Sequence, residues 1–198
     1  KATLEGIQNL MDAGVTVQTN TTITNYSAGH MNKMPSFLKS LGIKRFAMNM
    51  FIPSGSGLYH KELFIPYDEI GSIVDDVRKE AFNEGLTFYW YSPTPFCFYN
   101  PVAKGLGNKC CAAADGLISI SPGGEILPCS SWDMPLGNVL KKGFQKTWFS
   151  KEALKCKKKH YAPEKCKTCP SFTACQGACP LYWQYCGTDL LTNQRSKV

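Results

Sequence analysis

Apolar residues in the first half of the chain follow two alternating spacings. Leu4, Ile7 and Met11 recur every three or four residues, which is the spacing of one helix face, and Gly14 follows where a helix would end. Residues 15–23 are rich in β-branched side chains, which favour extended backbone. The pattern therefore predicts a helix followed by a strand.

The same alternation occurs twice more. A helical stripe over residues 34–41 precedes an apolar strand at residues 45–52, and a stripe over residues 70–81 precedes a strand at residues 86–91. Three helix-to-strand units predict a parallel sheet covered by helices. Three units are too few for a complete barrel, and the chain lacks an initiator Met. We therefore expect it to be a piece of a longer protein.

The second half of the chain has a different amino-acid composition and shorter predicted elements. From residues 92–96 onward, Cys, Pro, Gly and Lys dominate and the predicted elements are short. Residues 117–128 predict two short strands around a Gly-Gly turn, and residues 143–156 predict a helix. The change predicts two domains, residues 1–92 and residues 93–198.

Composition narrows the class of protein. The chain has 198 residues, of which 43% are hydrophobic and 19% charged, so it can bury a core and is neither disordered nor a coiled coil. No apolar stretch approaches the roughly 18 residues of a membrane helix, and the N-terminus lacks a secretory signal. We expect a cytoplasmic protein without a membrane partner.

The cysteines are confined to one part of the sequence. All ten lie between Cys97 and Cys186, and five of them lie within residues 166–186. A disulfide network has no reason to spare half of a chain, whereas metal ligands must converge in space. Zinc and iron-sulfur clusters both use groups of four thiolates, so the distribution alone leaves both chemistries open.

The spacing of these cysteines is more specific. The two blocks read Cys166-x2-Cys169-x5-Cys175-x3-Cys179-x6-Cys186 and Cys111-x12-Gly124-x4-Cys129. This pattern resembles the SPASM domain, the C-terminal extension of many radical S-adenosylmethionine enzymes. The hairpin sequence at residues 122–129 and the Leu-Gly-Asn sequence at residues 136–138 are also similar to segments of that family.

The resemblance implies an α/β fold: the C-terminal part of a partial (β/α)6 barrel in residues 1–92, then a small iron-sulfur SPASM domain with a β-hairpin and short helices in residues 93–198. It also implies two 4Fe4S clusters. The ligands of the first would be Cys97, Cys111, Cys129 and Cys179, and those of the second Cys166, Cys169, Cys175 and Cys186. Cys110 and Cys156 would be free thiols.

For the parent protein, the resemblance implies reductive cleavage of S-adenosylmethionine to a radical that abstracts hydrogen from a substrate. S-adenosylmethionine and a third 4Fe4S cluster would bind a Cys-x3-Cys-x2-Cys motif upstream, so we expect this fragment alone to be inactive. Implied partners are a peptide or protein substrate, with tetrapyrroles as a second substrate class, and an electron donor such as flavodoxin or ferredoxin. Ser130 stands where sulfatase maturases of the family carry an Asp, which argues against formylglycine formation.

Two other functions fit the same cysteines: a zinc-binding interaction module, and an iron-sulfur electron-transfer module without radical chemistry. The basic run at residues 155–167 also suggests nucleic-acid binding. Two clusters of about −2 each would lower the net charge of +7 to roughly +3, however, so we expect this run to act mainly as counter-charge.

Polar residues on the predicted strands suggest a second site. Asn20 and Asn49 interrupt strand segments, and Ser54 lies in a Gly-rich loop. In a barrel, inward polar side chains near the carboxyl ends of strands face the chemistry, so these three are candidate cofactor-binding residues. The alternative is an ordinary hydrogen-bonded polar residue of the core or rim.

Overall fold

The computed structural model describes residues 1–193, and of Asn193 only the backbone. The chain forms two compact units that are interleaved in sequence. The first comprises residues 1–51, 62–92 and 98–109, and the second comprises residues 52–61, 93–97 and those from 110 onward. The division into residues 1–92 and 93–198 stays a prediction, and its last residues, 194–198, lie outside the described part of the chain.

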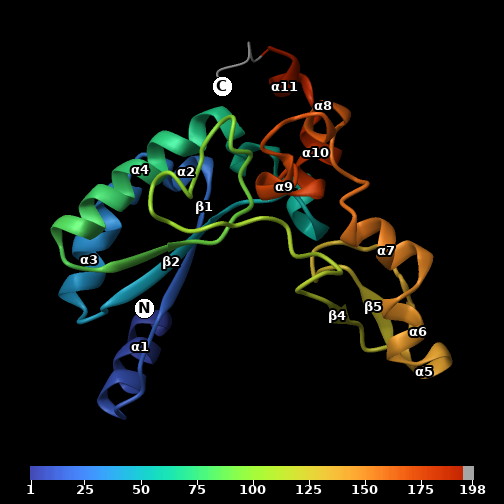
Figure 1. Cartoon of the computed structure of the whole chain (residues 1–198). Coiled ribbons are helices and arrows are strands. Elements are labelled where there is room, and N and C mark those ends of the chain that lie inside the picture. The colour runs from blue at the N-terminus through green and yellow to red at the C-terminus, as the bar shows by residue number, and fades with distance from the viewer. Residues whose placement is uncertain (194–198) are drawn as a thin grey trace. The chain divides into compact units, whose positions relative to one another are not determined.

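A parallel sheet forms the centre of the first unit (Figure 1). Its main elements are α1 (Ala2–Asp12), β1 (Thr19–Ile23), α3 (Met34–Ser40), β2 (Arg45–Met50), α4 (Tyr67–Asn83) and β3 (Thr87–Trp90). The short helices are α2 (Asn25–Ala28), η1 (Met31–Lys33) and η3 (Lys61–Leu63). The strand order is β1-β2-β3 with parallel pairing throughout. The predicted helix-to-strand units and their parallel arrangement are confirmed, with shorter strands than predicted.

Alternation along the strands gives the sheet two unlike faces. Ile23, Phe46, Met48 and Trp90 are buried, and the apolar stripe of α4 is buried as well, so these side chains form the core of the unit. The opposite face carries polar and aromatic side chains, such as Asn20, which is exposed. One face is therefore packed, and the other is free to line a site.

Helix α1 differs from the prediction in one respect. The helix forms where the spacing predicts it, but none of its residues is buried. Leu4 and Leu10 are 42% and 48% exposed. The apolar stripe of α1 is thus only partly covered: Ile7 and Met11 are half-buried, and a Cβ at Gly42 would lie 2.9 Å from Met11 Cε.

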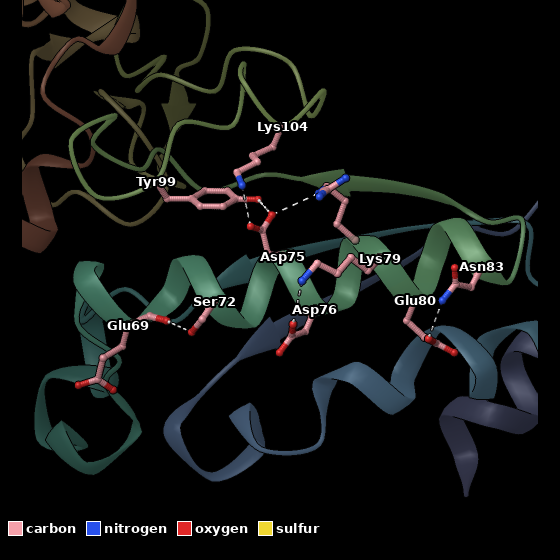
Figure 2. A network of polar contacts seen from close by, with 10 residues as sticks. Glu69, Ser72, Asp75, Asp76, Lys79, Glu80, Asn83, Tyr99 and Lys104 are labelled. Carbon is pink, nitrogen blue, oxygen red and sulfur yellow. Dashed lines mark hydrogen bonds and ion pairs between the residues drawn. The ribbon is translucent and has the colours of Figure 1, made fainter. Parts of the chain in front are cut away.

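A polar network on α4 holds the segment that follows β3 (Figure 2). Asp75 accepts hydrogen bonds from Lys104 Nζ at 2.8 Å, Tyr99 Oη at 3.1 Å and Arg78 Nε at 3.2 Å. Gly71 lets the Tyr99 ring approach the helix, since a Cβ at Gly71 would lie 2.9 Å from the ring. Burial raises the pKa of Asp75, but the hydrogen bonds from Lys104, Arg78 and Tyr99 outweigh burial and hold it below its ordinary value.

The second unit contains a small antiparallel sheet (Figure 1). Its strands are β4 (Ser119–Ile120), β5 (Glu125–Leu127) and β6 (Gly137–Asn138), in the order β4-β5-β6. The helices of the unit are η2 (Gly55–Tyr59), α5 (Val139–Lys142), α6 (Phe144–Trp148), α7 (Lys151–Lys157), α8 (Glu164–Lys167), α9 (Phe172–Cys175), α10 (Pro180–Cys186) and α11 (Asp189–Asn193). A core of Ala114, Ile126, Leu136, Ala153 and Cys156 lies between sheet and helices.

The helical structure predicted over residues 143–156 is confirmed, with a break in the middle. Two helices, α6 and α7, occupy this range. Ser150 separates them with an extended backbone, and its side chain accepts a hydrogen bond from the Ala153 N–H at 3.2 Å. A serine in this position starts a new helix instead of continuing the old one.

Among residues 1–193, no helix has both the length and the apolar character needed to cross a membrane.

Candidate metal centre

The turn between β4 and β5 positions Cys129, two residues after β5. Gly124 has φ +81°, and a Cβ there would lie 2.9 Å from Cγ of Leu140. The Asn138 side chain donates a hydrogen bond to the Gly123 carbonyl at 2.7 Å and accepts one from the Leu140 N–H at 2.9 Å. The Gly-Gly turn and the Leu-Gly-Asn sequence therefore contact each other and together hold β5, the strand that leads to Cys129.

A first thiol group consists of Cys111, Cys129 and Cys179. Burial, followed by the neighbouring thiols of Cys111 and Cys129, raises the pKa of Cys179 to about 12. The Ser131 N–H donates a hydrogen bond to Cys129 Sγ at 3.3 Å. Three cysteines that are far apart in sequence thus gather in the order that the hairpin motif and the later block suggest.

A second thiol group consists of Cys97, Cys166, Cys169 and Cys175. Burial, followed by Cys175, Cys97 and Cys169, raises the pKa of Cys166 to about 11. Burial, followed by Cys175 and Cys169, raises the pKa of Cys97 to about 11. The N–H of Phe96, the residue before Cys97, also donates a hydrogen bond to Cys175 Sγ at 3.4 Å, so the Cys97 segment lies beside this group.

The backbone between Cys175 and Cys179 separates the two groups. Gln176, Gly177 and Ala178 all have positive φ, at 57°, 75° and 64°. Consecutive left-handed residues are costly in L-amino acids and occur where the surrounding structure demands them. This reversal lets two cysteines only four residues apart belong to different groups.

The pKa of Cys186 is shifted by burial and not by the thiols of either group. Burial alone raises the pKa of its thiol to about 11. The resemblance groups Cys186 with Cys166, Cys169 and Cys175, and groups Cys97 with Cys111, Cys129 and Cys179. This ligand assignment stays a prediction. Residues 93–97 belong to the compact unit that contains all the later cysteines.

Three side chains that the sequence analysis did not single out surround the first thiol group. Lys159 is only 5% exposed, and its Nζ donates to the Cys111 carbonyl oxygen at 2.7 Å. Burial, followed by the neighbouring Cys111, raises the pKa of Tyr161. Tyr161 packs edge-on against Trp132, with ring centroids 5.4 Å apart. Spacing gives no signal for them, because none belongs to a ligand motif.

Cys156, predicted to be a free thiol, adjoins this group. It is buried, and its pKa is raised by burial and then by Cys111, while Lys159 lowers it. Its side chain packs in the core with Ala153 and Ile126. None of the ten cysteines forms a disulfide in the structure.

Comparison with known families decides what kind of domain holds these thiols. Residues 110–170 match the SPASM family, described as an iron-sulfur cluster-binding domain. These residues form a SPASM domain. The match includes Cys111, Cys129, Cys166 and Cys169, while Cys97, Cys175 and Cys179 lie outside the matched range.

Solved structures extend the likeness to the whole fold. The structure of Streptococcus suis SuiB bound to the precursor peptide SuiA is 15% identical, with a TM-score of 0.67 over 97% of this chain and 45% of that one. Native anSMEcpe with bound AdoMet is 14% identical, with a TM-score of 0.59 over 95% of this chain and 59% of that one. The chain thus has the mixed α/β fold of radical S-adenosylmethionine enzymes with a SPASM domain, and it spans about half the length of these structures. Comparison with curated proteins finds no matching sequence.

The thiols around the SPASM domain fit the group that such a domain binds. Thiolates are the ligands of iron-sulfur clusters. The pKa of Cys97, Cys166 and Cys179 is raised to about 11, 11 and 12, so a nearby cation would favour their thiolate forms. Within the described residues, no three His, Cys, Asp or Glu side chains are spaced to bind one metal ion.

The lysines of the basic run make different contacts within the SPASM domain. Lys165 lowers the pKa of both Cys97 and Cys166, so it lies near the second thiol group. Lys157 lies over the Trp148 ring, with Nζ 3.9 Å from its centroid. Lys167 forms an ion pair with Glu164. These lysines are engaged within the domain.

A cavity of about 310 Å³ opens beside the first thiol group of the SPASM domain. It is lined by Trp132, Met134, Glu152, Lys155, Cys156, His160 and Tyr161. Its lining combines aromatic and apolar side chains with charged ones. A small apolar or aromatic group could bind there.

The three polar candidates of the predicted barrel lie in different settings. Asn49 on β2 is half-buried and donates to Thr22 Oγ1 at 3.2 Å, while its Oδ1 is buried without a partner among the described residues. Asn20 on β1 is exposed on the strand next to it. Ser54 precedes η2 and belongs to the other compact unit. Only Asn49 offers a buried, unsatisfied polar atom.

Proposed function

We propose that the chain is part of a radical S-adenosylmethionine oxidoreductase, and that its SPASM domain binds two auxiliary 4Fe4S clusters. The supporting observation is that seven free thiols lie in two groups. Four of them belong to a stretch that matches an iron-sulfur cluster-binding family. One group takes Cys111, Cys129 and Cys179 as ligands, and the other takes Cys166, Cys169 and Cys175.

Backbone hydrogen bonds to these sulfur atoms favour their negatively charged thiolate form. When bound, the clusters supply one-electron transfer. Burial raises the pKa of Cys175 and Cys179. Hydrogen bonds from the N–H groups of Phe96 and Gly177 to Cys175, and from those of Leu181 and Tyr182 to Cys179, offset part of this rise. Such hydrogen bonds stabilise thiolates and tune the potential of a cluster that they ligate.

The parallel sheet is, in this proposal, the C-terminal part of a partial (β/α)6 barrel in residues 1–92. Its polar face would line the lumen, with Asn20 and Asn49 toward the cofactor or substrate and Ser54 in the loop after β2. The unpartnered Oδ1 of Asn49 supports this assignment, because a buried amide oxygen without a donor costs free energy unless a ligand satisfies it.

A peptide or protein is the substrate class that we favour. SuiB was solved with the precursor peptide SuiA, and anSMEcpe was solved with the Cp18Cys peptide at 14% identity, a TM-score of 0.60, and coverage of 95% of this chain and 60% of that one. The likeness to these structures shows the fold. From it we propose that the substrate of this protein is also a peptide or protein. Flavodoxin or ferredoxin would supply electrons, and S-adenosylmethionine and a third cluster would bind in the remainder of the parent.

Anaerobic reconstitution with iron and sulfide tests the metal assignment. We expect about eight irons and eight sulfides per chain and a brown colour, as two 4Fe4S clusters require. About two zinc ions per chain without sulfide after the same treatment would contradict the proposal and favour the zinc-binding module.

The full-length gene product tests the enzymatic part of the proposal. With S-adenosylmethionine and dithionite, the reconstituted parent is expected to release 5′-deoxyadenosine, and a candidate peptide encoded beside its gene is expected to increase the yield. A parent that binds clusters but cleaves no S-adenosylmethionine would instead be an electron-transfer module.

A further inference from the structure

We infer that a lysine-rich surface of the SPASM domain is the docking surface for a small acidic protein that carries one electron. The surface lies on α5, α6 and α7 (Figure 1), and we call it the lysine face. The inference rests on the proposed iron-sulfur function and adds the place where the electron donor binds. The lysine face is defined by six exposed lysines: Lys141, Lys142, Lys146, Lys151, Lys155 and Lys158.

Positive charge is concentrated in one short part of the chain. Residues 139–167 contain ten lysines and two glutamates, a formal charge of +8, whereas the whole chain carries +7. All other residues together therefore carry a formal charge of −1. Such a local excess of one sign attracts a protein of the opposite sign and raises its rate of association.

Contacts within the unit account for only part of this charge. Four of the ten lysines contact other residues of the unit, namely Lys157, Lys159, Lys165 and Lys167. The side chains of the lysine face are exposed, and none of the six forms an ion pair or a side-chain hydrogen bond within the described residues. These six charges are therefore open to a partner.

Helix α7 turns opposite faces to solvent and to the core. Lys151, Lys155 and Lys158 recur after four and three residues, so they share one side of the helix. Ala153 and Cys156 lie on the other side and are buried in the core of the unit. An α-helix with its side chains is about 10–12 Å across, so a protein on the lysine face lies this far from the core.

The core beneath α7 is connected to the first thiol group. Ile126 of β5 belongs to this core, and Cys129 follows β5 by two residues. Lys159, two residues after α7, donates to the Cys111 carbonyl oxygen at 2.7 Å. One helix thus separates a docked carrier from the segments that bear these two cysteines. In the transfer, the carrier loses one electron and the cluster gains it, and no bond forms or breaks.

Exposed apolar and aromatic side chains on the same helices favour a protein partner over a nucleic acid. Leu140 and Phe149 are 80% and 64% exposed, and protein interfaces combine such side chains with a charged rim. The Trp148 ring already stacks on Phe144, with centroids 5.6 Å apart, and lies under Lys157. Surfaces that bind single-stranded nucleic acids instead offer free aromatic faces to the bases.

Titration of the reconstituted chain with an acidic ferredoxin tests the docking surface. Isothermal calorimetry at about 50 mM and about 300 mM NaCl measures the Kd with little and with strong screening of exposed charges. We expect the Kd to rise at least about tenfold at the higher salt concentration. An affinity that does not change with salt would overturn the inference.

A triple substitution locates the binding on the lysine face. Lys141→Glu/Lys146→Glu/Lys155→Glu reverses one charge on each of α5, α6 and α7, and it is expected to weaken ferredoxin binding at least about tenfold. Iron and sulfide analysis of the variant shows whether its second unit is intact. Unchanged binding in a variant that keeps its clusters would overturn the inference.

The matched control is Lys1→Glu/Lys33→Glu/Lys44→Glu, which replaces three exposed lysines of the first unit. It changes the net charge of the chain by the same amount and is expected to keep the Kd within about twofold of the wild-type value. Equal weakening by the two triple substitutions would show that affinity follows net charge alone. That result would leave no docking surface and overturn the inference.

Two further measurements identify the kind of partner. Reduced ferredoxin, mixed anaerobically with the oxidised reconstituted chain, is expected to be oxidised about tenfold more slowly by the lysine-face variant than by the control variant. Equal rates would mean that electrons enter elsewhere and would overturn the inference. A single-stranded RNA of about 20 nucleotides that binds the lysine face more tightly than ferredoxin at equal salt would make it a nucleic-acid surface instead.

Failure of this inference is distinguishable from failure of the proposed function. A chain that takes up no iron and sulfide contradicts cluster binding, and metal analysis alone shows it. A chain that holds its clusters but does not bind ferredoxin contradicts only the docking surface.

Discussion

Lys159 places its ammonium group 2.7 Å from the carbonyl oxygen of Cys111, although the two residues are 48 positions apart. A second contact joins Lys159 Nζ to Asp115 Oδ2 at 3.3 Å, but the Asp115 side chain is 52% exposed. A buried cation is thereby fixed against the backbone of a proposed cluster ligand. Its charge acts where water screens little.

Lys159→Met is expected to make the reduction potential of the first cluster more negative, because a nearby positive charge favours the reduced form. Loss of the charged hydrogen bond is expected to lower the free energy of unfolding by about 1–3 kcal/mol. Redox titration followed by electron paramagnetic resonance, and urea unfolding, measure the two effects. The exposed neighbour Lys158 provides the control Lys158→Met, and equal effects of the two substitutions would contradict the role of Lys159.

Gly124→Ala is expected to destabilise the second unit by about 1–3 kcal/mol, because its φ of +81° disfavours a Cβ and Leu140 occupies the space. Gly123→Ala is the matched control, since Ser121 Oγ would be 3.8 Å from the new Cβ, which is an ordinary van der Waals contact. Thermal unfolding of the reconstituted proteins makes the comparison. Similar losses for both variants would show that the turn tolerates a side chain at either position.

Asp75→Asn is expected to lower the free energy of unfolding of the first unit by roughly 1 kcal/mol at pH 7, because three donors lose a charged acceptor. The folded pKa of Asp75 lies below its ordinary value of 3.8. Its contribution is therefore fully present above pH 3.8 and is lost as the pH falls through the lower folded value.

Urea unfolding at pH 7 and near pH 3, followed by the fluorescence of buried Trp90, measures this difference. The first unit contains no cysteine, so the metal-free chain serves for this measurement. Asp76→Asn is the control, since Asp76 is 63% exposed and its distance to Lys79 is 3.7 Å. A stability difference between Asp75→Asn and wild type that grows toward pH 3 would have the wrong sign.

Cys175→Ser is expected to remove about four irons per chain and to destabilise the C-terminal half, because cluster binding contributes folding free energy to a small metal-bound domain. Cys156→Ser is expected to leave the iron content unchanged, since Cys156 packs in the apolar core and adjoins Cys111 alone among the thiols that shift its pKa. Iron and sulfide analysis after reconstitution decides. Loss of about four irons in Cys156→Ser would make it a ligand of the first cluster.

The amino-acid sequence by itself determines the order of helices and strands in the first half and the chemistry of the second. Periodicity is local, so the stripe over residues 70–81 and the β-branched run near Thr22 are sufficient to predict α4 and β1. The spacing between Cys166 and Cys169 likewise predicts that two thiolates share one centre, because only two residues separate them.

Only the tertiary structure decides which distant residues share a centre. The backbone N–H of Phe96 donates a hydrogen bond to Cys175 Sγ, although the two residues are 79 positions apart in sequence. The burial of Lys159 beside Cys111 is a contact of the same kind. Local spacing carries no information on such contacts, since they depend on how α7 and the antiparallel sheet pack around a common core.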